Sequence, residues 1–104
     1  MTTTDPIIAK VRSALVEAYG PRLQRIVLFG SRARGDARAD SDYDVAVFLH
    51  DLADRHGEVR RLAGIQVHII DETNAFVHAL PFPAGAWAER TTFMHELRRE
   101  GLDL

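Results

Sequence analysis

Two aspartates at alternate positions, Asp42 and Asp44, open a run of apolar residues that is typical of a buried strand. Alternate residues of a strand point to the same face of a sheet, so the two carboxylates are predicted to lie side by side. Paired carboxylate oxygens suit a hard divalent cation such as Mg²⁺. The pattern predicts a metal site at the start of this strand, with Asp42 and Asp44 as metal ligands and catalytic groups.

A glycine–serine pair, Gly30 and Ser31, ends an earlier apolar run, and ten residues separate it from Asp42. Such a turn offers backbone N–H groups and a hydroxyl to a phosphate. Arg32 and Arg34 add positive charge directly after the turn. A phosphate-binding turn facing a carboxylate pair favours phosphoryl or nucleotidyl transfer from a metal-bound nucleoside triphosphate.

These motifs need a small sheet to position them. Apolar residues at helical spacing predict a first helix that starts at Thr4-Asp5-Pro6 and ends at Gly20-Pro21. The other expected elements are strands over about 25–29, 42–49 and 65–70, a possible helical turn over 31–34, helices over 52–62, 73–80 and 86–100, and a break at 81–85. This order predicts an α/β (α+β) fold, a small mixed sheet with flanking helices.

Composition narrows the classes of function. The 104 residues suit one domain spanning 1–104. The net charge of −2 gives no general attraction to nucleic acid or membrane, so direct nucleic-acid binding is not expected. The sequence has no long apolar stretch, no signal-peptide features and no cysteine, which excludes disulfides and thiolate sites and favours a cytoplasmic protein.

The spacing of the Gly-Ser pair and the Asp-X-Asp pair resembles that of the minimal nucleotidyltransferases (MNT). These belong to the superfamily that contains DNA polymerase beta, kanamycin nucleotidyltransferase and poly(A) polymerases. Residues 29–37 and 41–45 are similar to the sequence usual in that family, and the chain length matches its small stand-alone members. The resemblance implies a nucleotidyltransferase fold that binds ATP or another NTP with Mg²⁺. It assigns the β- and γ-phosphates to Gly30 and Ser31, the triphosphate also to Arg32 and Arg34, and the metal to Asp42 and Asp44.

Many minimal members are antitoxins encoded beside a helical HEPN-domain ribonuclease toxin, and some transfer AMP to a tyrosine of that toxin. The resemblance therefore implies an antitoxin that transfers AMP from Mg–NTP to a hydroxyl of a HEPN-type toxin. Two alternatives stay open. One is a catalytically inactive binding module that neutralises its toxin by contact alone. The other is the catalytic half of a two-subunit transferase that acts on a small hydroxylated molecule.

One position departs from the family. There, an aspartate on the next strand helps to bind the catalytic metal and takes the proton from the attacking hydroxyl. In the expected strand over 65–70 that position is His68, which makes His68 the third candidate catalytic residue. A neutral imidazole can accept a proton, but it is a poor ligand for magnesium. A histidine on a buried strand is more often a core residue than a base, and Asp71, the nearest acid, would face the other way.

Overall fold

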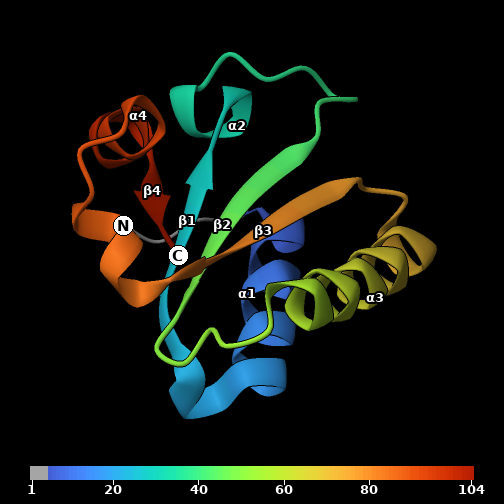
Figure 1. Cartoon of the computed structure of the whole chain (residues 1–104). Helices are drawn as coiled ribbons and strands as arrows, with labels where there is room; N and C mark the ends of the chain where they lie inside the picture. The colour runs from blue at the N-terminus through green and yellow to red at the C-terminus, as the bar shows by residue number, and fades with distance from the viewer. Residues whose placement is uncertain (1–4) are drawn as a thin grey trace.

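A four-stranded mixed sheet with helices on both faces forms the fold (Figure 1). The computed structural model describes residues 5–104, so Thr4, part of the expected helix start, lies outside them. The elements are α1 (Pro6–Tyr19), η1 (Gly20–Arg22), β1 (Leu23–Phe29), α2 (Ser31–Arg34), β2 (Tyr43–Leu49), α3 (Arg55–Thr73), β3 (Val77–Pro83), η2 (Ala84–Ala88), α4 (Thr92–Glu100) and β4 (Leu102–Asp103). The strand order is β3-β2-β1-β4, with β1 antiparallel to β2 and β4, and β3 parallel to β2. The expected fold class is confirmed.

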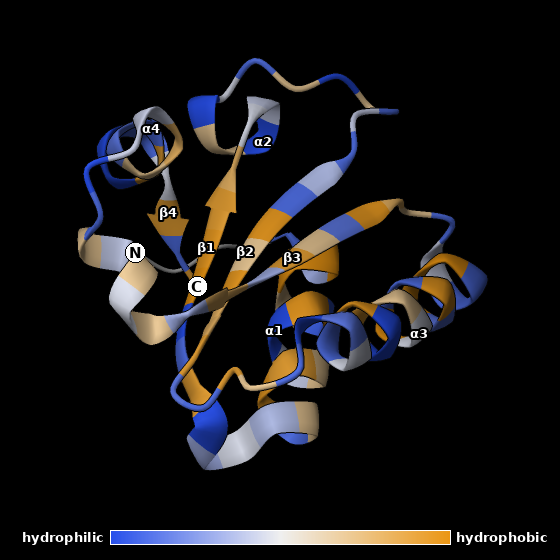
Figure 2. Ribbon diagram, in the orientation of Figure 1, coloured by the Kyte–Doolittle hydropathy of each residue, from blue (hydrophilic) through white to orange (hydrophobic). Residues whose placement is uncertain are grey.

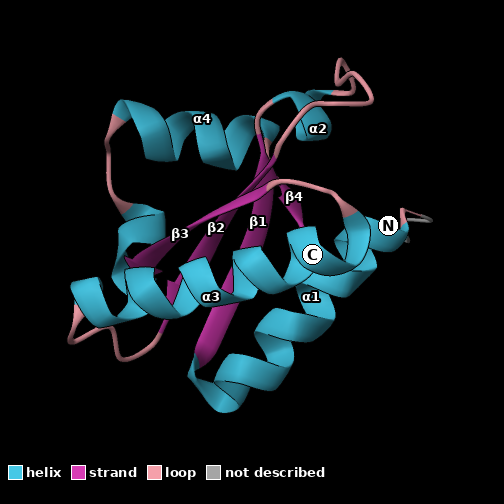
Figure 3. Cartoon of the chain, turned by 90° about the vertical axis from the view of Figure 1, so that its right-hand side faces the viewer, coloured by secondary structure: helices cyan, strands magenta, loops and turns pink. Residues whose placement is uncertain are grey.

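Strand β2 lies inside the sheet and is covered on both faces. Val45, Val47 and Leu49 pack with α1 and α3, whereas Ala46 and Phe48 pack with η2 and α4. In Figure 2 the strands are orange over much of their length, and Figure 3 shows α1 and α3 on one side of the sheet and α4 on the other. Burial of each large apolar side chain stabilises the fold by about 1.5–3 kcal/mol. Asp44 lies two residues before Ala46 on the same strand, so its side chain also points to the side of the sheet that α4 covers.

Helix α1 begins and ends close to the expected residues. The Asp5 carboxylate accepts a hydrogen bond from the Ile7 N–H at 2.8 Å and caps the helix, and Pro6 occupies the first turn. Gly20, with φ of 52°, ends the helix in a conformation that favours glycine. Capping residues read from the sequence therefore place this helix correctly.

The expected strand over 65–70 is wrong, because these residues lie within the long helix α3. Leu62 and Ile69 are buried and Ile65 is partly buried, which is helical spacing, while Val67 is 57% exposed. A strand would have placed Val67 on the same face as Ile65 and Ile69. The packing of one helical face against the sheet outweighs the weak strand preference of the β-branched residues.

Strand β3 replaces the helix expected over 73–80, and it extends through most of the expected break. Its outer edge is covered by α3: Gln66 Oε1 accepts from the Ala79 N–H at 2.8 Å, and Arg55 donates to the Pro81 carbonyl at 3.3 Å. Pro81 and Pro83 follow Ala79 at alternate positions, so their nitrogens also point away from β2. A proline is tolerated there because it removes no ladder hydrogen bond.

The C-terminal part also differs from the expected single helix over 86–100. Residues 84–88 form a 3₁₀ helix, and α4 starts only at Thr92, where the Thr91 hydroxyl accepts from the Met94 N–H. A two-residue strand, β4, then pairs with β1 and was not expected from the sequence. No helix in the part that the structure describes has the length and hydropathy required to cross a membrane.

Candidate functional site

The turn after β1 brings the backbone of Gly30 against the carboxylate of Asp44. Gly30 adopts φ of 74° and ψ of −156°, which is essentially restricted to glycine. A Cβ placed on Gly30 would lie 2.6 Å from Asp44 Oδ2. Ser31 and Arg32 are the first two residues of α2, so no carbonyl within the helix accepts a hydrogen bond from their N–H groups. The turn therefore offers free N–H donors next to a carboxylate.

The two aspartates lie where β2 begins. Asp42 is exposed and directly precedes the strand, and Asp44 is half-buried within it. Asp44 lies across from Phe29 of β1 and from His78 of β3. Burial raises the pKa of the Asp44 carboxyl, and the negative charge of Asp42 raises it further, while His78 opposes the shift. Their role as metal ligands stays a prediction.

The carboxylates of Asp42 and Asp44 suit a cation that is also bound by the phosphates of a nucleotide. Among residues 5–104, no three carboxylates or imidazoles lie close enough together to enclose a metal ion by themselves. Magnesium is commonly held by one or two carboxylates while substrate phosphates and water supply the other oxygens. Because Gly30 has no Cβ, its backbone can lie directly against the Asp44 carboxylate, and no side chain at Gly30 stands between the turn and Asp44 Oδ2. The residues of this site therefore suit Mg²⁺ bound together with a triphosphate.

Arg32 holds the loop that leads to Asp42. Its guanidinium donates to the Ser41 carbonyl at 2.9 Å and to the Ala39 carbonyl at 3.3 Å. The same group lies 4.2 Å from the centre of the Tyr43 ring, a cation–π contact. These contacts make Arg32 a positioning residue, and its direct contact with a triphosphate stays a prediction.

We expect Arg32→Ala to lower the free energy of unfolding by about 1–3 kcal/mol, because two charge-assisted hydrogen bonds and the ring contact are lost. Urea unfolding measures this change. Arg38→Ala in the same loop is the matched control, since the Arg38 side chain is exposed, and it should change the stability by less than about 0.5 kcal/mol. Equal stability of the two variants would show that the contacts of Arg32 do not hold the loop.

Arg34 is exposed and loosely held. Its Nε lies 3.4 Å from Asp36 Oδ2, and its Nη1 lies 3.8 Å from Glu100 Oε2 on α4. Exposed ion pairs of this kind contribute little to stability. The guanidinium can therefore reorient towards an anion, and its contact with a triphosphate stays a prediction.

The structure removes the geometric basis for His68 as the third catalytic residue. His68 lies on α3, its side chain is 68% exposed, and its Nε2 contacts the Glu72 carboxylate. Lys10 of α1 pairs with the same Glu72, and mainly through this contact holds the pKa of that carboxyl below its usual range. Since α3 covers the face of the sheet opposite Asp44, the sheet separates His68 from the site.

His78 is the residue that the sequence analysis missed. The parallel pairing of β2 and β3 sets it across from Asp44 on the same face, and its Nδ1 lies 3.8 Å from Asp44 Oδ1. The signal available in the sequence was the alternation of Val77, Ala79 and Pro81, which are buried with the more exposed His78 between them. The two prolines hid that alternation.

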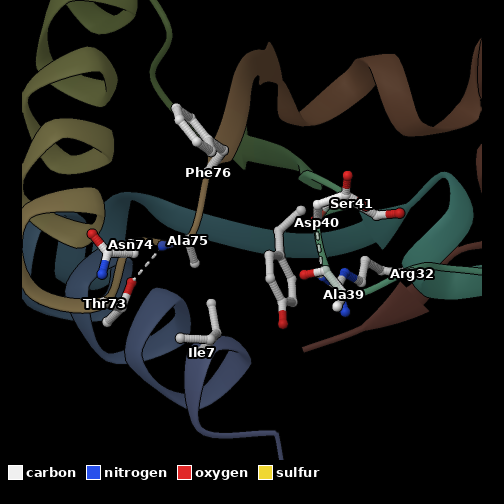
Figure 4. Close-up of a pocket in the computed structure, with 10 residues that line it drawn as sticks. Ile7, Arg32, Ala39, Asp40, Ser41, Thr73, Asn74, Ala75 and Phe76 are labelled. Atoms are coloured by element: carbon white, nitrogen blue, oxygen red, sulfur yellow. Dashed lines mark hydrogen bonds between the residues drawn. The ribbon is translucent and has the colours of Figure 1, made fainter.

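A cavity of about 300 Å³ lies beside the loop that leads to Asp42, and Figure 4 shows the residues that line it. The cavity is lined by Tyr43, Arg32, Phe76 and Ile7, among others. Tyr43 is the neighbour of Asp44 on β2, so its side chain points to the opposite face of the sheet. None of the predicted phosphate or metal residues other than Arg32 belongs to its lining. The cavity is therefore distinct from the turn at Gly30.

The raised pKa of Asp44 predicts that Asp44→Asn stabilises the protein at neutral pH. The folded state disfavours the ionised carboxylate, so wild type loses stability as the pH rises from the ordinary carboxyl pKa, about 3.9, through the raised folded value. Asparagine carries no such cost. Urea unfolding against pH should show the advantage of Asp44→Asn above this window and its disappearance below it. A variant that is less stable at neutral pH would contradict the prediction.

Residues 8–93 match the family described as "Nucleotidyltransferase domain". The chain belongs to this family. No curated protein sequence matches the chain. Among solved structures, the nucleotidyltransferase domain is similar to a toxin–antitoxin complex with AMP-PNP, with a TM-score of 0.66 and 21% identity over 91% of this chain and 69% of that chain.

A second similar structure is described as tri-AMPylated Shewanella oneidensis HEPN toxin in complex with MNT antitoxin. Its TM-score is 0.60 at 20% identity, over 93% of this chain and 67% of that chain. The MntA–HepT toxin–antitoxin complex matches with a TM-score of 0.59 at 18% identity, over 93% of this chain and 68% of that chain. At these identities the likeness shows that the nucleotidyltransferase domain shares the fold found in those complexes.

Proposed function

We propose that this nucleotidyltransferase domain binds a magnesium–nucleoside triphosphate and transfers its nucleotidyl group, AMP in the case of ATP, to a hydroxyl of a HEPN-type toxin. The observation that carries the proposal is the close approach of Gly30 to Asp44. A backbone turn with free N–H groups faces a half-buried carboxylate, and any side chain at Gly30 would occupy the space between them. The register of β1 and β2, in which Phe29 lies across from Asp44, sets this approach.

Each residue has a defined part in the transfer. The N–H groups of the turn at Gly30 and the Ser31 hydroxyl bind the phosphate oxygens, and Asp42 and Asp44 hold the metal. The metal, when bound, supplies neutralisation of the negative charge that develops on the phosphates. The acceptor oxygen forms a bond to the α-phosphorus, the bond from that phosphorus to the bridging oxygen breaks, and pyrophosphate leaves. The hydroxyl proton passes to a base or to water.

The proposed partner follows from the similar structures. In one, a HEPN toxin is AMPylated and bound to an MNT antitoxin, and in another a toxin–antitoxin complex holds AMP-PNP. This chain belongs to the nucleotidyltransferase domain family, and its fold is similar to that found in the complex with an MNT antitoxin. A HEPN-type toxin is thus the acceptor that the comparisons favour. Such a reaction would take place in the cytoplasm, where nucleoside triphosphates are abundant.

A contact-only antitoxin is the second candidate, and one observation favours it. Strand β3, next to Asp44, contains no aspartate or glutamate, so the third carboxylate of the family is absent from it. A chain that has lost this group could still bind and cover its toxin without transferring AMP.

AMP transfer to the partner distinguishes the two candidates. The chain is incubated with the product of the adjacent gene, labelled ATP and Mg²⁺ or Mn²⁺, and the partner is analysed by mass spectrometry for added AMP. Transfer that is lost in Asp42→Asn/Asp44→Asn supports the enzyme. A stable complex in which the toxin is inhibited but carries no AMP supports the contact-only antitoxin, and neither transfer nor complex formation would refute both.

A further inference from the structure

We propose that His78 is the third protein ligand of the nucleotide-bound cation, and that this nitrogen ligand gives the site a preference for a divalent transition metal such as Mn²⁺ over Mg²⁺. The inference rests on the proposed function, because it deepens the assignment of the same site. It replaces the sequence-based choice of His68 by the residue that the sheet places beside Asp44.

The register of the sheet is the first argument. Asp44 and His78 are partners in the parallel pairing of β2 and β3, so their side chains leave the same face of the sheet. His78 Nδ1 lies 3.8 Å from Asp44 Oδ1. Neighbouring ligands of an octahedral cation lie about 3 Å apart, given metal–ligand distances of about 2.1 Å. A shift of less than about 1 Å would bring both atoms to one cation.

The surroundings of His78 permit that shift. Its side chain is 59% exposed, so rotation of the ring costs little packing. Among the described residues, Asp44 is its one acidic neighbour within 4 Å, and no hydrogen bond fixes the ring. Because no three such side chains among the described residues enclose a cation by themselves, the proposal requires that the site close when cation and triphosphate enter together.

The type of ligand atom sets the preference of the site for Mn²⁺ over Mg²⁺. Magnesium binds oxygen ligands and rarely imidazole, whereas divalent transition metals accept imidazole together with carboxylates and phosphate oxygens. An imidazole at this position therefore adds affinity for Mn²⁺ and adds little for Mg²⁺. Because β3 contains no acid, no carboxylate on that strand competes for the position.

Electron paramagnetic resonance tests the ligand directly. The full chain, with only its histidines labelled with ¹⁵N, is saturated with Mn²⁺ and the non-hydrolysable analogue AMP-PNP at mildly alkaline pH, where imidazole is neutral. Electron-spin-echo spectra should show a ¹⁵N coupling in the wild type that disappears in His78→Ala. His68→Ala is the matched control, since His68 is an exposed histidine on the other side of the sheet, and it should retain the coupling.

Calorimetry tests the preference. The ratio of AMP-PNP affinity with Mn²⁺ to that with Mg²⁺ should fall at least about tenfold in His78→Asp, because a third carboxylate restores an all-oxygen set. Bound Mn²⁺ that depends on Asp42 and Asp44 but shows no histidine coupling, or an unchanged ratio in His78→Asp, would overturn this inference and leave the proposed function standing. No metal-dependent nucleotide binding at all would overturn both.

Discussion

Changing both Asp42 and Asp44 to asparagine is expected to weaken metal-dependent binding of a nucleoside triphosphate by more than about a hundredfold. The double variant removes two negative charges and leaves neutral amides in their place, and the affinity of a hard cation follows the charge of its oxygen ligands. The fold should survive, because Asp42 is exposed and the ionised Asp44 is disfavoured by burial. Isothermal titration calorimetry with AMP-PNP, with Mg²⁺ or Mn²⁺ and with chelator, measures the loss.

A charge-matched control separates metal binding from general electrostatics. Asp36→Asn/Asp40→Asn removes two negative charges from the same loop, where both side chains are exposed. This control should retain the triphosphate affinity within a few-fold, because screening weakens the effect of exposed charges that do not touch the ligand. If both double variants bind like wild type, or both fail equally, Asp42 and Asp44 are not the metal ligands.

Gly30→Ala is expected to lower the free energy of unfolding by about 1–3 kcal/mol and to abolish triphosphate binding. The backbone of Gly30, with φ of 74° and ψ of −156°, is strained for any residue with a Cβ. The new methyl group would also lie 2.6 Å from Asp44 Oδ2 and force that carboxylate away. Urea unfolding and calorimetry on the same sample measure the two effects.

Gly35→Ala is the control that separates the effect of backbone strain from the effect of a methyl group placed against Asp44. Gly35 also has a positive φ, 84°, but a Cβ there would meet nothing within 4 Å. We expect it to lose stability to a similar or smaller extent while it keeps its nucleotide affinity. If Gly30→Ala binds the triphosphate as well as Gly35→Ala does, the turn at Gly30 serves only the fold.

Local chemistry explains why the first half of the chain could be predicted. Asp5 and Pro6 begin α1 through contacts within one turn, and Gly20 ends it. The apolar runs that become β1 and β2 are interrupted only by the glycine–serine turn and the polar loop, so periodicity and turn residues agree there. The central position of β2 followed from its apolar residues on both faces, as the two packing layers confirm.

The second half needed the tertiary structure. Residues 65–70 have β-branched side chains, but their strand preference is worth less than the burial of Leu62 and Ile69 on one helical face. Two prolines made β3 look like a break, since only the position of the strand at the sheet edge shows that their nitrogens face away from β2.

The sequence by itself determined the family motif, because the turn at Gly30 and the aspartates of β2 are defined by residue type and spacing along the chain. Only the tertiary structure decided which histidine stands beside Asp44. That choice depends on the pairing of β2 with β3, whose partners Asp44 and His78 are brought together by a parallel connection through α3. A one-residue slip in register would move every side chain of β3 to the other face, and His68 lies on α3 and not on a strand. The pairing of strands that are distant in the sequence therefore selects His78 over His68.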